Sequence, residues 1–119
     1  MSKNYNELLN KTQILGDELI ELLKLREKGK IDFELIDIRE PFEYENLRIK
    51  GVDKLLPITR FQTDIDKWDE LINNKKFVIY CRTGNRTSYL QRFIKEKYNI
   101  DIPHLTYGIV DYSGEVESG

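Results

Sequence analysis

The sequence has one cysteine, Cys81, so the chain cannot close an internal disulfide. It has no apolar run close to the roughly 20 residues that a membrane-spanning helix requires. The first ten residues lack the apolar stretch of a secretory signal. Repeats, low-complexity segments and Pro- or Gly-rich linkers are also absent. We therefore expect a single cytoplasmic domain over residues 1–119 that does not interact with membranes.

An excess of charge of either sign is missing as well. The 19 basic and 21 acidic residues leave a formal net charge of −2. No overall field then attracts nucleic acid or anionic lipid, so we expect no nucleic-acid partner, and any attraction for a ligand must be local. The sequence has no CxxC, HExxH or GxxxxGK[ST] motif. A zinc site, a metalloprotease site or a nucleotide-binding P-loop therefore has no support, and no metal is expected.

Apolar periodicity predicts strands that alternate with helices. Short β-rich runs predict strands over residues 33–39, 54–60, 75–81 and 101–106. Helical spacing predicts helices from about Asp17 to Gly29 and over residues 41–47, 64–74 and 88–98. We expect Trp68 and the stripe of Tyr89 and Phe93 to be buried. This alternation predicts an α/β fold with a mainly parallel central sheet flanked by helices.

Cys81 lies where the predicted strand "FVIYC" ends, and ligands in such folds bind beyond the carboxyl ends of strands. The following loop leads directly into a helix predicted to begin at Thr87 or Ser88. We expect Gly84 to allow tight curvature and Asn85 to accept a left-handed conformation. Successive backbone N–H groups would then point inward and form an anion-binding nest.

The nest gives Cys81 a chemical role. Its sulfur is expected to face backbone dipoles and the guanidinium groups of Arg82 and Arg86, surroundings that stabilise a thiolate. A lone intracellular cysteine is usually a small buried hydrophobe. The "RTGNR" that follows, together with the strand-to-helix context, favours a nucleophilic thiol instead.

Two separated motifs resemble those of the single-domain rhodaneses, which are sulfurtransferases, and the resemblance extends from about Ile14 to Tyr112. The signature "D-x-R-x-x-x-E-Y" is matched by Asp37, Arg39, Glu43 and Tyr44. The active-site pattern "C-R-x-G-x-R" is matched by Cys81, Arg82, Gly84 and Arg86.

This resemblance implies a three-layer rhodanese-like domain and no cofactor. The Cys81 thiolate would attack a sulfane sulfur of a small anion or persulfide donor, hold it as a persulfide and release it to a thiol or protein acceptor. The predicted substrate-binding residues are Arg82, Thr83, Gly84, Asn85, Arg86 and Thr87. The predicted supporting residues are Asp37, Arg39 and Arg48, the first two as a salt bridge at a strand end.

The chain also departs from the family pattern. "LRIKGV" replaces the usual "G-H-I-P-G-A", which places Arg48 near the expected pocket mouth. "TYGIVDY" replaces "EGGIxxW", so Tyr107 occupies a usual glycine position. The only histidine, His104, lies in a predicted strand, and a catalytic role for it is not expected because a thiol can rely on its own activation.

Two other function classes remain open at this stage. A phosphatase of related fold also uses a cysteine thiolate in an anion nest, but its loop places Cys and Arg six positions apart, and here that position is Thr87. A catalytically weak interaction or regulatory module would keep the fold. Such modules commonly lose the cysteine, whereas this chain retains Cys81.

Overall fold

The computed structural model describes residues 5–119. The helices are α1 (Tyr5–Leu8), α2 (Gly16–Glu27), α3 (Pro41–Asn46), α4 (Ile65–Asn74) and α5 (Asn85–Tyr98), with short 3-10 turns at Ile58–Arg60 and Ile109–Asp111. The strands are β1 (Gln13–Ile14), β2 (Glu34–Asp37), β3 (Arg48–Ile49), β4 (Lys54–Leu55), β5 (Phe77–Tyr80), β6 (His104–Leu105) and β7 (Val116–Glu117). Within the described part of the chain, no helix has the length and apolar character needed to cross a membrane.

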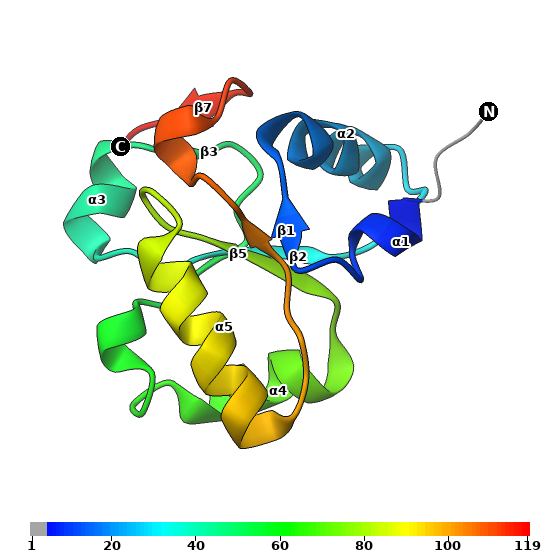
Figure 1. Ribbon diagram of the computed structural model, residues 1–119. Coiled ribbons are helices and arrows are strands. Elements are labelled where there is room, and N and C mark those ends of the chain that lie inside the picture. Colours follow the sequence, from blue (N-terminus) through cyan, green and yellow to red (C-terminus); the bar gives the residue numbers. More distant parts are fainter. Residues whose placement is uncertain (1–4) are drawn as a thin grey trace.

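Five strands form a central sheet in the order β1-β6-β5-β2-β4, and each neighbouring pair is parallel. Helix α2 covers one face of this sheet, and α4 and α5 cover the other (Figure 1). Strands β3 and β7 pair antiparallel in a separate two-stranded sheet. The predicted α/β fold with a mainly parallel sheet between helical layers is therefore confirmed.

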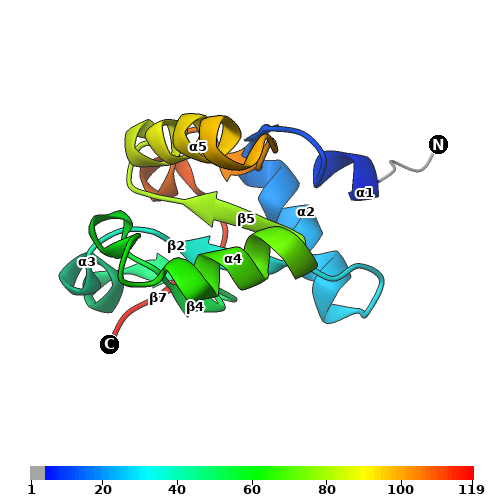
Figure 2. The ribbon, with the colours of Figure 1, turned by 90° about the horizontal axis from the view of Figure 1, so that it is seen from below.

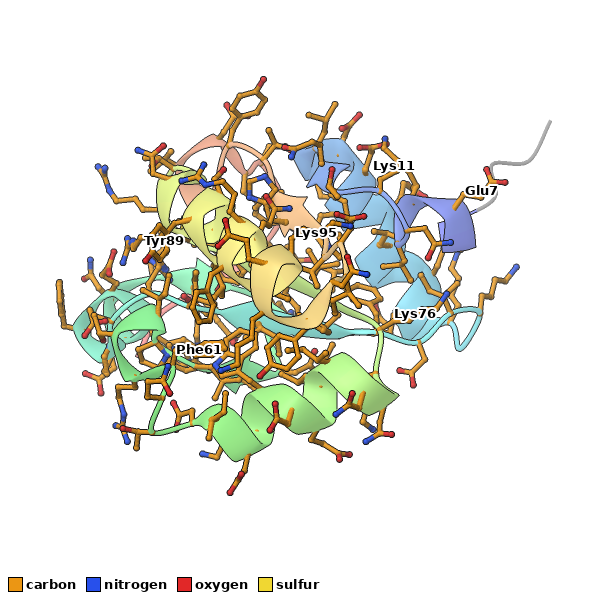
Figure 3. All side chains as sticks on the ribbon, turned by 60° about the horizontal axis from the view of Figure 1, so that its bottom comes forward. Glu7, Lys11, Phe61, Lys76, Tyr89 and Lys95 are labelled. Atoms are coloured by element: carbon orange, nitrogen blue, oxygen red, sulfur yellow. The ribbon has the colours of Figure 1, made fainter. Side chains whose placement is uncertain are left out.

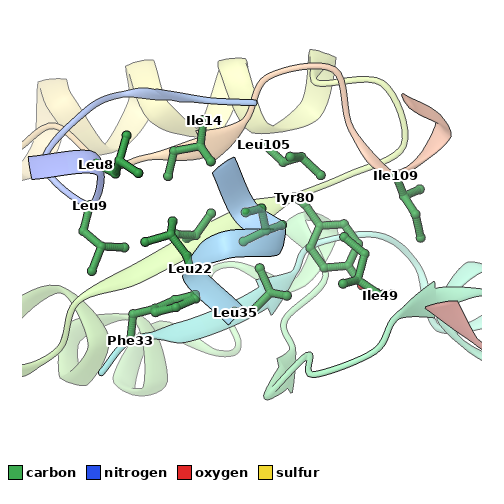
Figure 4. Packing of buried hydrophobic residues seen from close by; sticks show 12 residues of the cluster. Leu8, Leu9, Ile14, Leu22, Phe33, Leu35, Ile49, Tyr80, Leu105 and Ile109 are labelled. Carbon is green, nitrogen blue, oxygen red and sulfur yellow. The ribbon is translucent and has the colours of Figure 1, made fainter. Parts of the chain in front are cut away.

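The side-chain alternation of β5 divides the core into two clusters. Val78 and Tyr80 face the α2 side, where they pack with Leu19 and Leu22 (Figure 4). Phe77 and Ile79 face the opposite side and pack against residues of α4 and α5. In the view from below, α4 and α5 flank β5 (Figure 2). The strand is buried on both faces, which explains its continuous apolar sequence.

An aromatic group joins α4 to α5. Phe61 stacks on Trp68 at a centroid distance of 5.4 Å and meets the edge of Phe93 at 5.3 Å. Figure 3 shows Phe61 between the two helices. The prediction that Trp68 is buried is confirmed, and Phe93 is partly buried. Tyr89 is predicted to be buried in the same stripe, but it is 59% exposed in the structure.

Two predicted strands are shorter in the structure. The segment 54–60 contributes only Lys54–Leu55, because Pro57 lacks an N–H and a 3-10 turn follows it. The segment 101–106 contributes only His104–Leu105, which follows Pro103. Helix α2 begins at Gly16, within one residue of the predicted start, and the Glu18 carboxylate accepts a hydrogen bond from the Leu15 N–H at 2.9 Å.

Candidate active site

Cys81 directly follows β5, at the carboxyl end of the parallel sheet, as the sequence predicts. Strand alternation turns it to the side of Phe77 and Ile79, in the cluster packed against α4 and α5. The residue is fully buried, with an exposed fraction of 0%. The sulfur therefore lies at the base of the loop, and the reacting atom of a substrate must enter the loop to contact it.

The loop from Cys81 to Arg86 turns at Gly84, which has a φ of +98°. The Gly84 N–H donates a hydrogen bond to the Cys81 sulfur at 3.2 Å. A Cβ at Gly84 would overlap the carbonyl oxygen of Thr106. Both the left-handed conformation and the lack of space therefore require glycine here, as the sequence predicts for the curvature of the loop.

Helix α5 begins at Asn85, earlier than the predicted start at Thr87 or Ser88. Gly84 alone completes the left-handed turn, so the chain is already helical at the next residue. The expectation of a left-handed Asn85 is therefore wrong. Among residues 5–119, the one non-glycine residue with a positive φ is Asn99, at the carboxyl end of α5.

The segment after β6 holds the loop in place. The Ile109 N–H donates to the Cys81 carbonyl at 3.0 Å, and the Val110 N–H donates to the Arg82 carbonyl at 3.2 Å. Gly108, with a φ of +73°, lies so close that a Cβ would overlap the Arg82 carbonyl oxygen. Gly108 occupies the position of the second glycine of the family pattern, and the sequence alone predicts no role for it.

The Arg86 side chain is bound by a carboxylate from another helix. Its guanidinium forms a two-point ion pair with Glu43 of α3, with Nη1–Oε1 at 2.7 Å and Nη2–Oε2 at 2.9 Å. The hydrogen bonds from Arg86 lower the pKa of Glu43 to about 2. Interaction with Cys81 is among the weaker contributions that raise the pKa of Arg86. Glu43 was recognised only as part of a motif, and the structure gives it this function.

The other predicted loop residues divide by exposure. Arg82, Thr83 and Asn85 are exposed, whereas Thr87 is fully buried. Their contacts with a substrate remain predictions. Tyr107, which replaces a family glycine, is 58% exposed.

Asp37 and Arg39 form a buried ion pair at the end of β2. Arg39 Nη2 lies 2.7 Å from Asp37 Oδ2, and the Arg39 N–H donates to Asp37 Oδ1 at 2.8 Å. Arg39 Nη2 also donates to the Leu47 carbonyl at 2.6 Å. The pair thus ties β2 to the end of α3. This is the structural salt bridge that the sequence analysis expected at the strand end.

Arg48 lies on the two-stranded sheet. Its guanidinium lies 4.7 Å from the centre of the Tyr44 ring and its Nε lies 3.5 Å from Glu117 Oε1. Arg48 Nη1 donates to the Tyr44 carbonyl at 3.2 Å. These contacts join α3 to β7, so Arg48 supports the element that carries Glu43.

A hydrogen-bonded group that sequence reasoning missed lies beside the sulfur. Thr87 Oγ1 is 3.6 Å from Cys81 Sγ and 2.6 Å from His104 Nδ1. His104 Nε2 is 2.9 Å from Gln13 Oε1. Thr87 and His104 are both buried, whereas Gln13 is exposed. No sequence spacing connects these positions, because parallel pairing of β1 with β6 brings Gln13 beside His104.

A parallel α/β sheet with a cysteine in a tight loop before a helix defines a class of domains with a thiol site at the sheet's carboxyl edge. The sequence model of the Rhodanese-like domain matches residues 18–115. The chain therefore belongs to the rhodanese-like domain family. It is also 33% identical over 66 residues to an uncharacterised 16.5 kDa protein from Synechococcus elongatus. That match covers 54% of this chain and 43% of the relative, so it spans less than half of the longer protein.

Solved structures share the fold. A rhodanese-like domain protein from Staphylococcus aureus is 21% identical, with a TM-score of 0.70, and the match covers 92% of this chain and 99% of that one. A protein of unknown function from Rhodopseudomonas palustris, described as a possible tyrosine phosphatase, is 20% identical, with a TM-score of 0.68. That match covers 98% of this chain and 96% of the other. At these identities the likeness concerns the fold alone.

Proposed function

We propose that this protein is a sulfurtransferase that passes sulfane sulfur through a persulfide on Cys81. The observation that carries the proposal is the hydrogen bond from the Gly84 N–H to the Cys81 sulfur inside a loop of six residues. A thiol held at a strand end with a backbone donor aimed at it is suited to bear negative charge. Membership of the rhodanese-like domain family supports this chemistry.

The reaction has two displacements. The Cys81 thiolate attacks the outer sulfur of thiosulfate, the bond between the two thiosulfate sulfurs breaks, and sulfite leaves with that electron pair. The product is a Cys81 persulfide with its charge on the terminal sulfur. A thiophile such as cyanide or a thiolate then attacks the terminal sulfur and restores the Cys81 thiolate. Charge is conserved in both steps, and neither step requires a metal or redox cofactor.

Burial of Cys81 restricts which sulfur donors can react with it. A fully buried sulfur is met most easily by an exposed terminal sulfur atom on a small molecule, as in thiosulfate, polysulfide or a low-molecular-weight persulfide. The same restriction applies to the acceptor, which must reach the terminal persulfide sulfur. The proposal places this exchange in a reducing cytoplasm, where a single cysteine remains a thiol.

The test is intact-protein mass spectrometry after incubation with thiosulfate or polysulfide, beside an assay of thiocyanate formation from cyanide. We expect the protein to gain the mass of one sulfur atom and to lose it when cyanide is added. Because Cys81 is the only cysteine, the site of the added sulfur is unambiguous. Cys81→Ser is expected to lose both signals, since a hydroxyl is a far weaker nucleophile at neutral pH.

A matched control is Lys95→Ala, which removes an exposed cation of α5 outside the loop. This variant is expected to keep the wild-type rate. Thiocyanate formation by Cys81→Ser at the wild-type rate would contradict the proposal, as would a wild-type protein that takes up no sulfur from any of the donors.

A further inference from the structure

A continuous hydrogen-bonded chain runs from the Cys81 sulfur to the surface at β1. Its links are Sγ to Thr87 Oγ1 at 3.6 Å, Oγ1 to His104 Nδ1 at 2.6 Å, and His104 Nε2 to Gln13 Oε1 at 2.9 Å. Thr87 and His104 are buried, and α5, β6 and β1 each contribute one residue. Polar groups buried in this way are held by their partners, so the chain has a defined arrangement.

The position of each hydrogen follows from the outer end of the chain. Gln13 Oε1 also accepts a hydrogen bond from Thr106 Oγ1 at 3.0 Å, and a carbonyl oxygen can only accept. His104 therefore carries its hydrogen on Nε2, which leaves a lone pair on Nδ1. Thr87 has one hydroxyl hydrogen and two acceptors within reach, the Gly84 carbonyl at 3.1 Å and His104 Nδ1 at 2.6 Å. A contact of 2.6 Å between Oγ1 and Nδ1 requires a hydrogen between the two atoms, and Nδ1 carries none, so the hydroxyl hydrogen lies on that link. The Thr87 oxygen is then free to accept the hydrogen of the Cys81 thiol.

We propose that His104 takes up the Cys81 thiol proton through Thr87 when the thiolate forms. Thr87 receives the proton from Sγ as it passes its own hydrogen to Nδ1 of His104. The products are a Cys81 thiolate, an intact Thr87 hydroxyl that now donates to the sulfur, and a His104 imidazolium. One proton moves by one place along each link, and the net charge does not change. His104 does not touch the substrate, so it is a positioning residue that acts through Thr87.

The surroundings set the protonation state of His104 before the transfer. Burial lowers the pKa of His104, so the imidazole is neutral at neutral pH and its Nδ1 holds a lone pair; the same burial disfavours an isolated imidazolium, which therefore forms only together with the thiolate. The groups that bond to it, Gln13 and Thr87, are uncharged, and its neighbour on β5 is Ile79. On the far side of Thr87 lies the Cys81 thiol, at the start of the loop that ends at Arg86. A thiolate and an imidazolium separated by one hydroxyl attract each other strongly where water is excluded.

The test rests on the fact that the chain has one cysteine and one histidine, so each is observed alone in the full-length protein. The rate of Cys81 alkylation by iodoacetamide is measured against pH. Thr87→Val removes the hydroxyl with little change in volume, and we expect about tenfold slower alkylation at neutral pH and a profile moved to higher pH. Thr87→Ser keeps the hydroxyl and is expected to restore the wild-type profile.

The matched control is Thr63→Val, which removes the hydroxyl of an exposed threonine in the turn before α4, outside the loop and outside the chain from Cys81 to Gln13. Its alkylation profile is expected to match the wild type. Nitrogen NMR of the unmodified protein provides a second measurement that requires no variant, and it is expected to show His104 with its hydrogen on Nε2.

Two results would overturn the proposal: an unchanged alkylation profile in a folded Thr87→Val protein, or a wild-type His104 with its hydrogen on Nδ1. The proton transfer would prepare the attacking thiolate, and in that respect alone the inference rests on the proposed function. Neither measurement uses a sulfur donor. Failure of the alkylation or NMR test would leave sulfur transfer possible. Failure of sulfur transfer would leave the proton transfer from Cys81 to His104 open to these two tests.

Discussion

Arg86 and Glu43 form a two-point ion pair that ties the first turn of α5 to α3, with both N–O distances below 3 Å. The pair lies at the end of the loop that holds Cys81. The two contacts fix the position of the Arg86 guanidinium. They also link two motifs that are separated by more than 40 positions in the sequence.

The ion pair predicts a pH dependence of stability. The pKa of Glu43 lies at about 2 in the folded protein, below its ordinary value of 4.5. Between these values the unfolded state binds the extra proton, so the free energy of unfolding decreases as the pH falls through this window. Glu43→Gln is expected to remove that part of the decrease, as measured by urea denaturation at a series of pH values. An identical pH dependence in the variant and the wild type would show that Glu43 is not responsible.

Substitution of Gly84 in the loop, or of Gly108 in the segment packed against it, is expected to destabilise the protein because each position lacks space for a Cβ. Gly84→Ala and Gly108→Ala each place a Cβ on a carbonyl oxygen in addition to straining a left-handed residue, and we expect losses of about 3–5 kcal/mol in the free energy of unfolding. Both variants are also expected to lose sulfur transfer, because the loop must move.

Gly29→Ala is the matched control for that pair. Gly29 has a φ of +75°, yet no atom lies within 4 Å of the added Cβ. It therefore measures the cost of the left-handed conformation alone, about 1–2 kcal/mol. Equal losses at Gly29 and Gly84 would exclude the steric explanation.

The buried pair of Asp37 and Arg39 is expected to matter far more than an exposed one. Asp37→Asn leaves the Arg39 charge without its partner in a buried site, which costs about 3–5 kcal/mol in stability. The exposed pair of Lys95 and Asp101 provides the comparison, because Lys95→Ala is expected to cost about 0–1 kcal/mol. Thermal and urea unfolding of both variants checks the difference. A loss of less than about 1 kcal/mol for Asp37→Asn would contradict the structural role.

The loop is also expected to discriminate against phosphate esters. Cys81 and Arg86 are five positions apart, and the Arg86 guanidinium is already bound by Glu43. A tetrahedral phosphoryl group would leave donors and oxygens unpaired, at about 1–3 kcal/mol for each unsatisfied group. We therefore expect no appreciable hydrolysis of p-nitrophenyl phosphate. A phosphatase rate above the rate of sulfur transfer, lost in Cys81→Ser, would favour the phosphatase interpretation.

Several parts of the fold were predictable because they leave a local signal in the sequence. The apolar run of β5 and the helical spacing of Trp68 and Leu71 each act over a few neighbouring residues. The strands β3 and β7 were not predicted, since two-residue strands have no periodicity and their pairing joins positions far apart in the chain.

The candidate site shows the same limit. The curvature at Gly84 follows from the residue type, so the sequence predicts it. The function of Glu43 and the contact between Thr87 and His104 depend on how α3, β6 and α5 pack, which no local pattern encodes. Tyr89 and Phe93 lie one helical turn apart on the same face of α5, yet only Phe93 packs against the core, so helical spacing alone does not determine burial.

The hydrogen bonds from Ile109 and Val110 to the loop have a dynamic consequence. These two amide hydrogens can exchange with solvent only when the loop at Cys81 separates from the segment after β6. Their exchange rates therefore report how often the loop opens. If the loop rarely opens, its N–H donors are already in place before a sulfur anion binds. Binding then orders little of the protein, and the affinity is not reduced by a loss of conformational entropy.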